Sequence, residues 1–545
     1  MKWRLSVIQA TFIIFTLGIA LRLGYWQVVK AADLAAEAAW QRQSFLEIPS
    51  PRGSILSSDG FPLVTNQEAY LLYINPRQFI FSEKLSRLLP ASPSARLSNI
   101  PPNLGWYLIA RHISASIRDQ IQSLRLAGVG FEPDSSRLYP EASSSAHLLG
   151  FVGQDSAGNP QGYFGLEGYY NRQLVGVSGK LVQEKDALNR PILIGVQDYL
   201  PPQPGSILTT SINRALQFIS YQKLAAALTR YGAVSGTVTI MEPSTGRILA
   251  MVSLPNYDPS LFSQASPELY KNPIISDSFE PGSTFKTLVM AAALDAQAVQ
   301  PDTVCDICAG PVSVSDYVVK TWNDKYYPKS IMNEVIQHSD NVGMVFVGRR
   351  LGKHKLISYL KKFGLGQPTG VDLQEESSPQ IRPESTWVDI DLATASFGQG
   401  IAVTPLQMLR AVSAIANRGL MPKPKVVDKI NDKIIPPSPP ARVISQSAAL
   451  QMTLMMVNAV DSGEAKWAKP KGFSIAGKTG TAQIPVSGHY DADKTIASFV
   501  GFAPADQPKF AMLVTLREPK SSPWGSETAA PLWFDIAKEI FRLLK

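Results

Sequence analysis

The feature that most restricts the fold of this chain is an uncharged apolar run close to its N-terminus. From Leu5 to Leu21 the sequence has 17 residues without a charge, and Lys2 and Arg4 precede them. About 20 apolar residues cross a bilayer as a helix, and basic residues ahead of the span favour a cytoplasmic N-terminus. A cleaved signal peptide is the alternative, but its apolar region is usually shorter and a cleavage site follows it directly. The pattern favours an uncleaved single-pass anchor, with the rest of the chain outside the cytoplasm.

The remaining sequence has the composition of folded domains. Hydrophobic residues make up 45% of the 545 residues and charged residues 18%, which excludes disorder over most of the length. The net charge is +8, and residues 1–30 supply half of it. The rest of the chain therefore carries too little positive charge to indicate a nucleic acid partner, and it contains no zinc-finger spacing or glycine-rich phosphate loop.

The chain contains two cysteines, Cys305 and Cys308, separated by two residues. Two thiolates cannot form a four-cysteine zinc site, and no nearby histidine pair completes a mixed one. The sequence leaves two interpretations open: a disulfide outside the cytoplasm, or two reduced thiols at a turn.

Turn residues divide the chain into an anchor at 1–30, a mixed region at 31–205 and a larger region at 206–545. The segment 31–50 is expected to continue the anchor helix, and Asp59-Gly60 predicts a hairpin turn within 51–64. A proline-rich stretch, Leu200 to Gly205, closes the middle region. We find no catalytic constellation before residue 206, so the middle region is interpreted as a structural or docking module.

The last region has the pattern of one α/β domain. Residues 235–241 and 247–252 alternate around a turn, which predicts an antiparallel hairpin. Helical signals dominate 281–363, and strands are expected at 474–483, 497–503 and 509–516. The final helix, 531–545, is expected to bury one face, consisting of Leu532, Ile536, Ile540 and Leu543. We expect an antiparallel sheet flanked by helices and closed by the first and last elements.

Ser283 and Lys286 form the first motif that carries chemistry. Pro281-Gly282 predicts a turn, so that Ser283 begins a helix, and Lys286 lies on the same face one turn later. A serine hydroxyl becomes a good nucleophile only when an adjacent base takes its proton. A lysine is such a base when burial or a second cation destabilises its ammonium.

Two further motifs follow in order. Ser339-Asp340-Asn341 lies between two helical stretches, where Asp and Asn also serve as turn and cap residues. Lys478-Thr479-Gly480-Thr481 lies in a strand whose glycines indicate a close backbone approach or a bulged edge. Each motif alone is common, but the three together in this order are the signature of penicillin-binding proteins and class A β-lactamases.

The chain resembles the penicillin-binding transpeptidases, and among them the class B monofunctional type. The resemblance extends to Arg52-Gly-Ser-Ile, Gly165-Leu-Glu167, the segment 397–407 and Ala529-Ala-Pro531. It implies a transpeptidase domain at 206–545, an elongated mixed α+β pedestal of the dimerisation type at 31–205, and an anchor in the bacterial cytoplasmic membrane. It also implies a polytopic glycosyltransferase of the SEDS type and other division proteins as partners.

The implied reaction is acyl transfer on peptidoglycan stem peptides ending in D-Ala-D-Ala, with β-lactams as inhibitors. Ser283 would be the nucleophile, Lys286 its base, Ser339 a proton relay and Asn341 a ligand of the substrate amide. Lys478, Thr479, Gly480 and Thr481 would hold the terminal carboxylate, and the backbone N–H groups of Ser283 and Thr481 would bind the oxyanion. The resemblance implies no metal and no cofactor.

The sequence departs from the family in the segment 270–279, which lacks an Asn-Arg-Ala pattern seen in many relatives. It leaves no room for an N-terminal glycosyltransferase domain or for appended C-terminal modules. The segment 497–504 favours a septal, cell-division enzyme over an elongation enzyme. A β-lactam-hydrolysing or β-lactam-sensing protein and a non-catalytic scaffold are the remaining alternatives.

Overall fold

The computed structural model describes residues 2–184, 197–486 and 489–543. Contacts within these residues divide the chain into two compact units. The first consists of residues 1–52 and 175–205, and the second of residues 53–174 and 206–545. Ser206, which follows the proline-rich stretch, is where the chain returns to the second unit.

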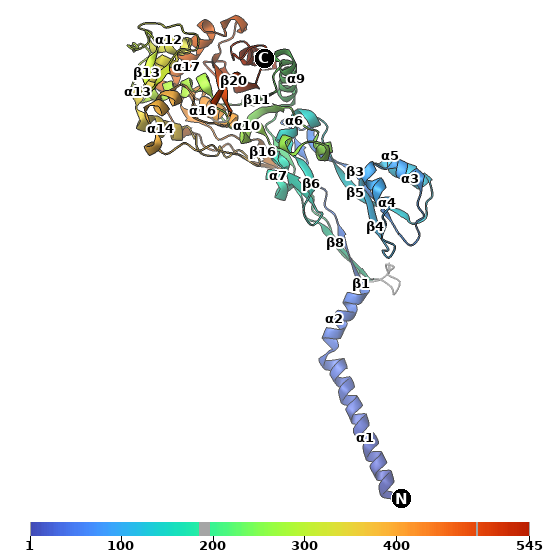
Figure 1. Cartoon of the computed structure of the whole chain (residues 1–545). Coiled ribbons are helices and arrows are strands. Elements are labelled where there is room, and N and C mark those ends of the chain that lie inside the picture. Colours follow the sequence, from blue (N-terminus) through green and yellow to red (C-terminus); the bar gives the residue numbers. More distant parts are fainter. Residues whose placement is uncertain (1, 185–196, 487–488, 544–545) are drawn as a thin grey trace. The chain divides into compact units, whose positions relative to one another are not determined.

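The first unit begins with the expected apolar helix. Helix α1 (Lys2–Gly24) continues into a turn of π-helix (Tyr25–Val29), and this 28-residue span is long and apolar enough to cross a membrane. None of its residues is buried inside the protein (Figure 1). The apolar surface therefore has no protein partner within the described chain, as a lipid-facing helix requires.

The helix expected over 31–50 ends earlier than predicted. Helix α2 spans Ala31–Arg42, but Gln43–Ile48 forms strand β1. This strand pairs antiparallel with β8 (Gly179–Glu184), and β8 pairs with β9 (Gln197–Leu200). The prediction was wrong beyond Arg42 because the partner strand lies more than a hundred residues away, where local sequence gives no sign of it.

The second unit contains a mixed sheet built mainly from its N-terminal part. The strand order is β17-β16-β10-β2-β3-β4, and β5 pairs with β3. The predicted hairpin at Asp59-Gly60 is confirmed, since Ile55 of β2 pairs with Val64 of β3. The strands are β2 (Ile55–Leu56), β3 (Pro62–Ile74), β4 (Tyr107–Ile113), β5 (Val129–Leu138), β10 (Leu208–Thr210), β16 (Val427–Ile430) and β17 (Lys433–Ile434).

Short helices and one hairpin complete this part. Helices α3, α4 and α5 cover β3, β4 and β5 around a small apolar core that includes Leu72, Ile74 and Ile109. The elements are α3 (Glu83–Leu88), α4 (Ala91–Leu97), α5 (Ala115–Ser123), α6 (Ala142–Leu149), β6 (Phe151–Gln154), β7 (Pro160–Tyr163), α7 (Gly165–Tyr169) and α8 (Asn171–Leu174).

A buried ion pair links segments of this part that are distant in sequence. The Arg137 guanidinium donates from Nε to Glu167 at 2.7 Å, from Nη1 to Asn66 at 2.8 Å and from Nη2 to the Gly53 carbonyl at 2.7 Å. Glu167 is fully buried. Because a buried charge is costly unless it is paired and hydrogen-bonded, removal of either partner would leave the other uncompensated.

The remainder of the second unit is organised by a five-stranded antiparallel sheet. Its order is β12-β11-β21-β20-β19, with β11 (Ser235–Met241), β12 (Ile248–Leu254), β19 (Ala476–Val486), β20 (His489–Ala503) and β21 (Phe510–Arg517). The expected hairpin and the three later strands are confirmed. Strand β11 pairs with β21, so the first and last strands of this sheet along the chain meet as predicted.

Both faces of this sheet are covered by helices, which explains why β21 is an almost continuous apolar run. Helices α9 (Arg214–Tyr231) and α18 (Ala529–Leu543) cover one face (Figure 1). Helices α16 (Pro405–Ala416) and α17 (Gln446–Ser462) cover the other. Met512 and Val514 belong to the apolar core on the α9–α18 side of the sheet, and Leu513 belongs to the core on the α16–α17 side, as strand alternation requires.

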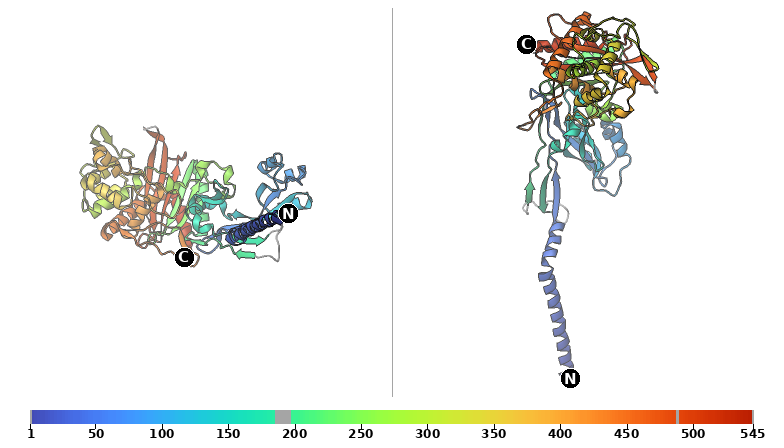
Figure 2. Two further views of the ribbon diagram at one scale, coloured as in Figure 1. Left: turned by 90° about the horizontal axis from the view of Figure 1, so that it is seen from below. Right: turned by 90° about the vertical axis from the view of Figure 1, so that its left-hand side faces the viewer.

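Helix α11 (Lys286–Asp295) lies in the apolar core on the α16–α17 side of the sheet, and it packs against α13 (Asn341–Leu351), α16 and α17. In the left view of Figure 2 the yellow and orange helices lie on one side of the red strands. The other elements are α10 (Pro273–Ser276), β13 (Val312–Val314), β14 (Tyr317–Val319), α12 (Met332–Gln337), α13 (Asn341–Leu351), α14 (Lys353–Lys362), α15 (Asp389–Ser396), β15 (Leu420–Met421) and β18 (Ala441–Arg442), with 3₁₀ turns at 259–264, 267–269, 282–284, 384–386 and 466–468.

Two smaller predictions can be compared with the structure. On α18, Leu532, Ile536 and Ile540 are buried as expected, but Leu543 is exposed because the helix has passed the edge of the core. Cys305 and Cys308 form a disulfide, which selects one of the two interpretations left open by the sequence.

The buried His147 predicts a pH-dependent stability. Burial on α6 lowers its pKa to about 4, and a hydrogen bond with the backbone of Leu269 only partly opposes this. The unfolded chain takes up the proton near pH 6.5, so the free energy of unfolding falls as the pH drops from 6.5 toward 4, by up to about 3 kcal/mol. Melting temperatures measured across this range should fall less steeply in His147→Gln than in the wild type. Equal slopes would contradict the prediction, and His354→Gln, at an exposed histidine, is the control.

Candidate active site

Ser283 lies in a tight turn at the entrance to α11. The 3₁₀ turn Gly282–Thr284 precedes the helix, and Gly282 has a positive φ of 52°. A Cβ at Gly282 would come within 2.9 Å of the Thr481 carbonyl oxygen, so the turn packs directly on strand β19. Glycine is required here by both the backbone conformation and the space, and the serine is thereby held beside the third motif.

Lys286 is buried, and its ammonium nitrogen contacts the second motif. Its Nζ donates to the Ser339 carbonyl oxygen at 2.6 Å and to Asn341 Oδ1 at 2.7 Å, and lies 3.3 Å from Ser339 Oγ. Within the described part of the chain, no hydrogen bond joins Lys286 to Ser283. A neutral amine donates two hydrogens, which the two short contacts use, so its lone pair is left for a hydroxyl group.

The second motif is a turn between two helices, as predicted. Ser339 has a positive φ of 55° after α12, and Asp340 caps α13 by accepting from the backbone N–H groups of Val342 and Gly343. Asn341 donates from Nδ2 to the Lys320 carbonyl at 3.0 Å and accepts from Lys286. Both ends of its amide therefore bind the protein itself, which fixes the position of the Lys286 amine.

The two lysines of the motifs differ in their surroundings. Burial, and next the positive charge of Lys478, hold the pKa of Lys286 well below its usual range, although Asp340 and Glu464 partly oppose this. Burial also lowers the pKa of Lys478, and Glu464 opposes it. Because Lys286 experiences both effects, it loses its proton first as the pH rises.

The third motif lies on β19, at the edge of the five-stranded sheet. Lys478 is buried, and its Nζ contacts Thr479 through the carbonyl at 3.3 Å and Oγ1 at 3.2 Å. Thr481 Oγ1 accepts from the Gly525 N–H at 3.0 Å. A Cβ on Gly480 would come within 2.4 Å of Ser498 Oγ and 2.8 Å of Thr284 Cγ2, so a side chain at Gly480 would separate β19 from the Ser283 turn.

A cavity of about 300 Å³ joins the three motifs. Five residues predicted from the sequence line it: Ser283, Ser339, Asn341, Thr479 and Thr481. Lys286 and Lys478 lie buried behind its wall, and Gly480 provides close packing. The structure thus brings all eight predicted site residues to one place.

Sequence reasoning did not assign a role to nine other residues that line this cavity. They are Gly282, Trp322, Phe397, Gln399, Glu464, Gln483, Thr495, Pro523 and Trp524. Trp322 and Trp524 pack edge to face with ring centroids 4.9 Å apart, although 202 residues separate them in sequence. Phe397 and Gln399 belong to a segment that carried the family resemblance, so this segment was the one available signal.

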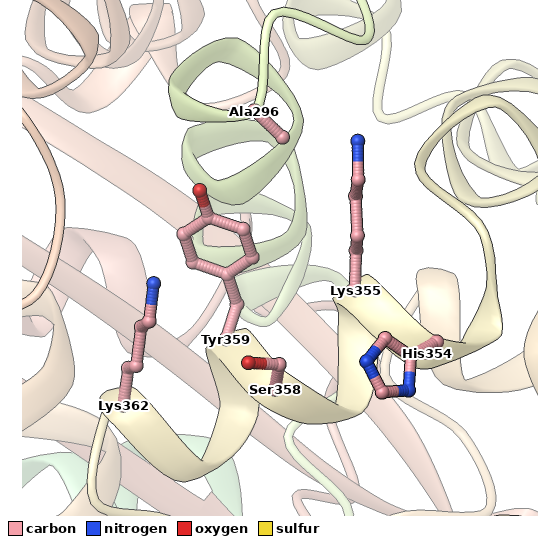
Figure 3. A pocket seen from close by; sticks show the side chains of 6 residues that line it. All are labelled: Ala296, His354, Lys355, Ser358, Tyr359 and Lys362. Atoms are coloured by element: carbon pink, nitrogen blue, oxygen red, sulfur yellow. The ribbon is translucent and has the colours of Figure 1, made fainter.

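A second cavity, of about 280 Å³, lies between α14 and the end of α11. Figure 3 shows Lys355, Tyr359 and Lys362 extending from α14 on the same side. Tyr359 donates to Asp295 at 2.7 Å, and its pKa is raised by burial first and then by that carboxylate. None of the motif residues lines this cavity, so we assign no chemistry to it.

The described residues contain no group of three or more His, Cys, Asp or Glu side chains that could hold a metal ion. The cavity of about 300 Å³ is lined by Ser283, and behind its wall lie two buried lysines, Lys286 and Lys478, whose pKa values are both lowered by burial. Such a site performs acyl transfer through a covalent serine intermediate.

The comparisons with known proteins agree with this geometry. The family described as "Penicillin binding protein transpeptidase domain" matches residues 236–542, and "Penicillin-binding Protein dimerisation domain" matches residues 47–210. The chain therefore belongs to the class B penicillin-binding proteins.

Individual relatives match over nearly the whole chain. Stage V sporulation protein D of Bacillus subtilis is 34% identical over 98% of this chain and 85% of its own length. Peptidoglycan D,D-transpeptidase FtsI of Escherichia coli is 30% identical over 100% and 92%. The crystal structure of penicillin-binding protein 3 from Mycobacterium tuberculosis, complexed with aztreonam, has a TM-score of 0.71 at 25% identity and covers 91% of this chain and 97% of that one. Penicillin-binding protein 2X from Streptococcus thermophilus, with a TM-score of 0.75 at 22% identity over 92% and 80%, shares the fold.

The packing at Gly480 predicts a loss of activity without unfolding. In Gly480→Ala the new methyl group must displace Ser498 or Thr284, which moves β19 away from Ser283. A displacement of about 1 Å in such a site costs about a hundredfold in rate, and we expect that loss in the rate of acylation by benzylpenicillin. Gly310→Ala is the control, because a Cβ at Gly310 meets no atom within 4 Å. Equal acylation rates in the two variants would contradict the prediction.

Proposed function

We propose that this protein is a peptidoglycan D,D-transpeptidase that cross-links stem peptides during septal wall synthesis. The observation that carries the proposal is the buried Lys286 amine, which lies three residues after Ser283 in the chain and donates to the Ser339 carbonyl and to Asn341. Burial holds the pKa of this lysine well below its usual range, which favours the neutral amine that can accept a proton from serine.

The first half of the reaction forms the acyl-enzyme. Ser283 Oγ attacks the carbonyl carbon between the two D-alanines, and its proton passes to Lys286 Nζ. The backbone N–H groups of Ser283 and Thr481 stabilise the oxyanion, and each such donor contributes about 3 kcal/mol to the transition state. The C–N bond then breaks while Ser339 Oγ relays a proton to the departing amine of D-alanine.

The second half transfers the acyl group to an acceptor. The amine of a neighbouring stem peptide attacks the ester carbonyl of acylated Ser283 and loses its proton to the Lys286–Ser339 pair. The ester C–O bond then breaks, and the pair returns a proton to Ser283 Oγ. The new amide is the cross-link. Thr479 and Thr481 hold the terminal carboxylate of the donor peptide beside the positive charge of Lys478, while Asn341 both positions Lys286 and binds the substrate amide.

A β-lactam imitates the donor peptide in this scheme. Its strained amide acylates Ser283 in the same way, but the leaving nitrogen remains tethered. Transfer to an acceptor is therefore blocked, and the acyl-enzyme persists.

The non-catalytic regions are proposed to locate the enzyme. Residues 1–30 anchor the chain in the cytoplasmic membrane with the N-terminus inside the cell, residues 31–205 form a pedestal, and residues 206–545 form the catalytic domain outside the cytoplasm. The anchor and pedestal would contact a polytopic glycosyltransferase of the SEDS type. The similarity to FtsI supports a septal role over the elongation alternative.

The nucleophile can be tested by mass spectrometry. We expect a single stable adduct after incubation with benzylpenicillin, on the peptide that contains Ser283, and no adduct in Ser283→Ala. Lys286→Ala should lose acylation almost entirely because the base is gone. An adduct that persists in Ser283→Ala would reject the assignment, and rapid loss of the wild-type adduct by hydrolysis would favour a β-lactamase.

The separate roles of the membrane anchor and the catalytic domain can be tested by truncation. A chain that begins at Ala31 should be soluble and acylated at the rate of the full-length protein, because the three motifs all follow residue 280. The same chain should not support septal growth in cells, because it lacks the anchor. Full complementation by the truncated chain would show that the anchor has no such role.

A further inference from the structure

One acidic side chain in the active-site cavity has no role in the mechanism above. Glu464 lies in the connection between α17 and β19 and lines the same cavity as Ser283 and Ser339. Its Oε1 atom is buried and accepts no hydrogen bond from the described residues. Burying a carboxylate oxygen without a donor is costly, so a compensating charge nearby is expected.

The position of Glu464 is fixed by the residue before it. A Cβ at Gly463 would lie 2.2 Å from the Ala459 carbonyl oxygen and 3.0 Å from the Gln337 carbonyl oxygen. The backbone at Gly463 therefore packs on the end of α12, immediately before the Ser339 turn. Glu464, the next residue, lines the cavity together with Ser339 of the second motif and Thr479 of the third.

Lys478 requires a counter-charge in this region. Its Nζ contacts two neutral oxygens of Thr479, and its side chain is almost completely buried. Two carboxylates act on the lysines of the motifs: Asp340, at the start of α13, and Glu464, in the connection before β19. The two lysines also act on each other, since the charge of Lys478 lowers the pKa of Lys286 on α11. His338, at the end of α12, acts on Asp340.

The two acidic groups act differently. Asp340 uses one oxygen to cap α13 and raises the pKa of Lys286, whereas Glu464 raises the pKa of both Lys286 and Lys478. Among the described residues, Glu464 is thus the carboxylate that acts on Lys478.

We propose that Glu464 is a positioning residue for acyl transfer, and that its carboxylate in the cavity wall is the counter-charge of Lys478. The inference rests on the proposed function and goes beyond it, because it assigns the charge state of the site to a residue outside the three motifs. Without Glu464, the charged Lys478 would be a buried cation beside neutral groups, and it would lose its proton at a lower pH.

The test is the pH profile of acylation of the full-length chain by benzylpenicillin. The second-order rate constant, measured between about pH 5 and pH 10, should rise as Lys286 deprotonates and fall as Lys478 deprotonates. The rising and falling limbs of this pH profile report the macroscopic pKa values of the coupled Lys286–Lys478 pair. In Glu464→Gln a negative charge is lost, so both ammonium groups release protons more readily. Both limbs should move to lower pH by roughly one unit.

Two variants serve as controls. Glu464→Asp keeps the charge and should keep both limbs close to their wild-type positions. Glu527→Gln removes an exposed carboxylate three residues after Trp524 and should not move them, because solvent screens that charge. Unmoved limbs in Glu464→Gln, or equal movement in Glu527→Gln, would overturn the inference.

A further variant keeps the test informative if Glu464→Gln does not fold. In Lys478→Arg the guanidinium remains charged throughout this pH range, so the descending limb should disappear. A descending limb that persists in Lys478→Arg would also overturn the inference. Failure of the wild type to form an adduct at Ser283 would instead reject the proposed function, so the two failures are distinguishable.

Discussion

The removal of water from the Lys286 amine is the constraint on which the rest of this site depends. A solvated lysine is protonated at neutral pH and cannot take a proton from serine. All nine residues from Lys286 to Leu294 are buried, so the fold places an ionisable group in a helix that otherwise consists of core side chains. The surrounding sheet and helices therefore serve both to stabilise the domain and to set the reactivity of Ser283.

The polar contacts that hold this arrangement extend well beyond the cavity. Asp372 accepts from the backbone N–H groups of Val426 and Val427 at 2.6 and 2.8 Å, and from the Tyr170 hydroxyl at 2.9 Å. These hydrogen bonds connect the region after residue 206 to Tyr170, which lies in the N-terminal part of the same unit. Glu141 and Arg214 form another such link at 2.6 Å. These contacts explain why the N-terminal part of this unit and the catalytic region pack as one body.

The sequence predicted those parts of the fold that depend on local periodicity and on turn residues. Examples are the hairpins at Asp59-Gly60 and around 242–247, the strands of the five-stranded sheet, and the i, i+3 spacing of Ser283 and Lys286. The strand at 43–48 was missed because its pairing with β8 is non-local. Glu464 was missed for a similar reason, because nothing between Gly463 and Lys466 distinguishes it from a surface residue, and the other residues of the cavity that it lines are mostly distant in sequence.

The complete burial of α11 limits how this enzyme can change under selection. A substitution anywhere between Lys286 and Leu294 disturbs a close-packed core and shifts Lys286 and the adjoining Ser283 turn, so we expect most such changes to abolish activity rather than to modify it. Trp322, Gln483 and Trp524 line the cavity from the loops and from the sheet edge instead. Substitutions that change how the cavity distinguishes a stem peptide from an antibiotic are therefore expected at these lining residues. Substitutions in the buried helix beside Ser283 are expected to be rare.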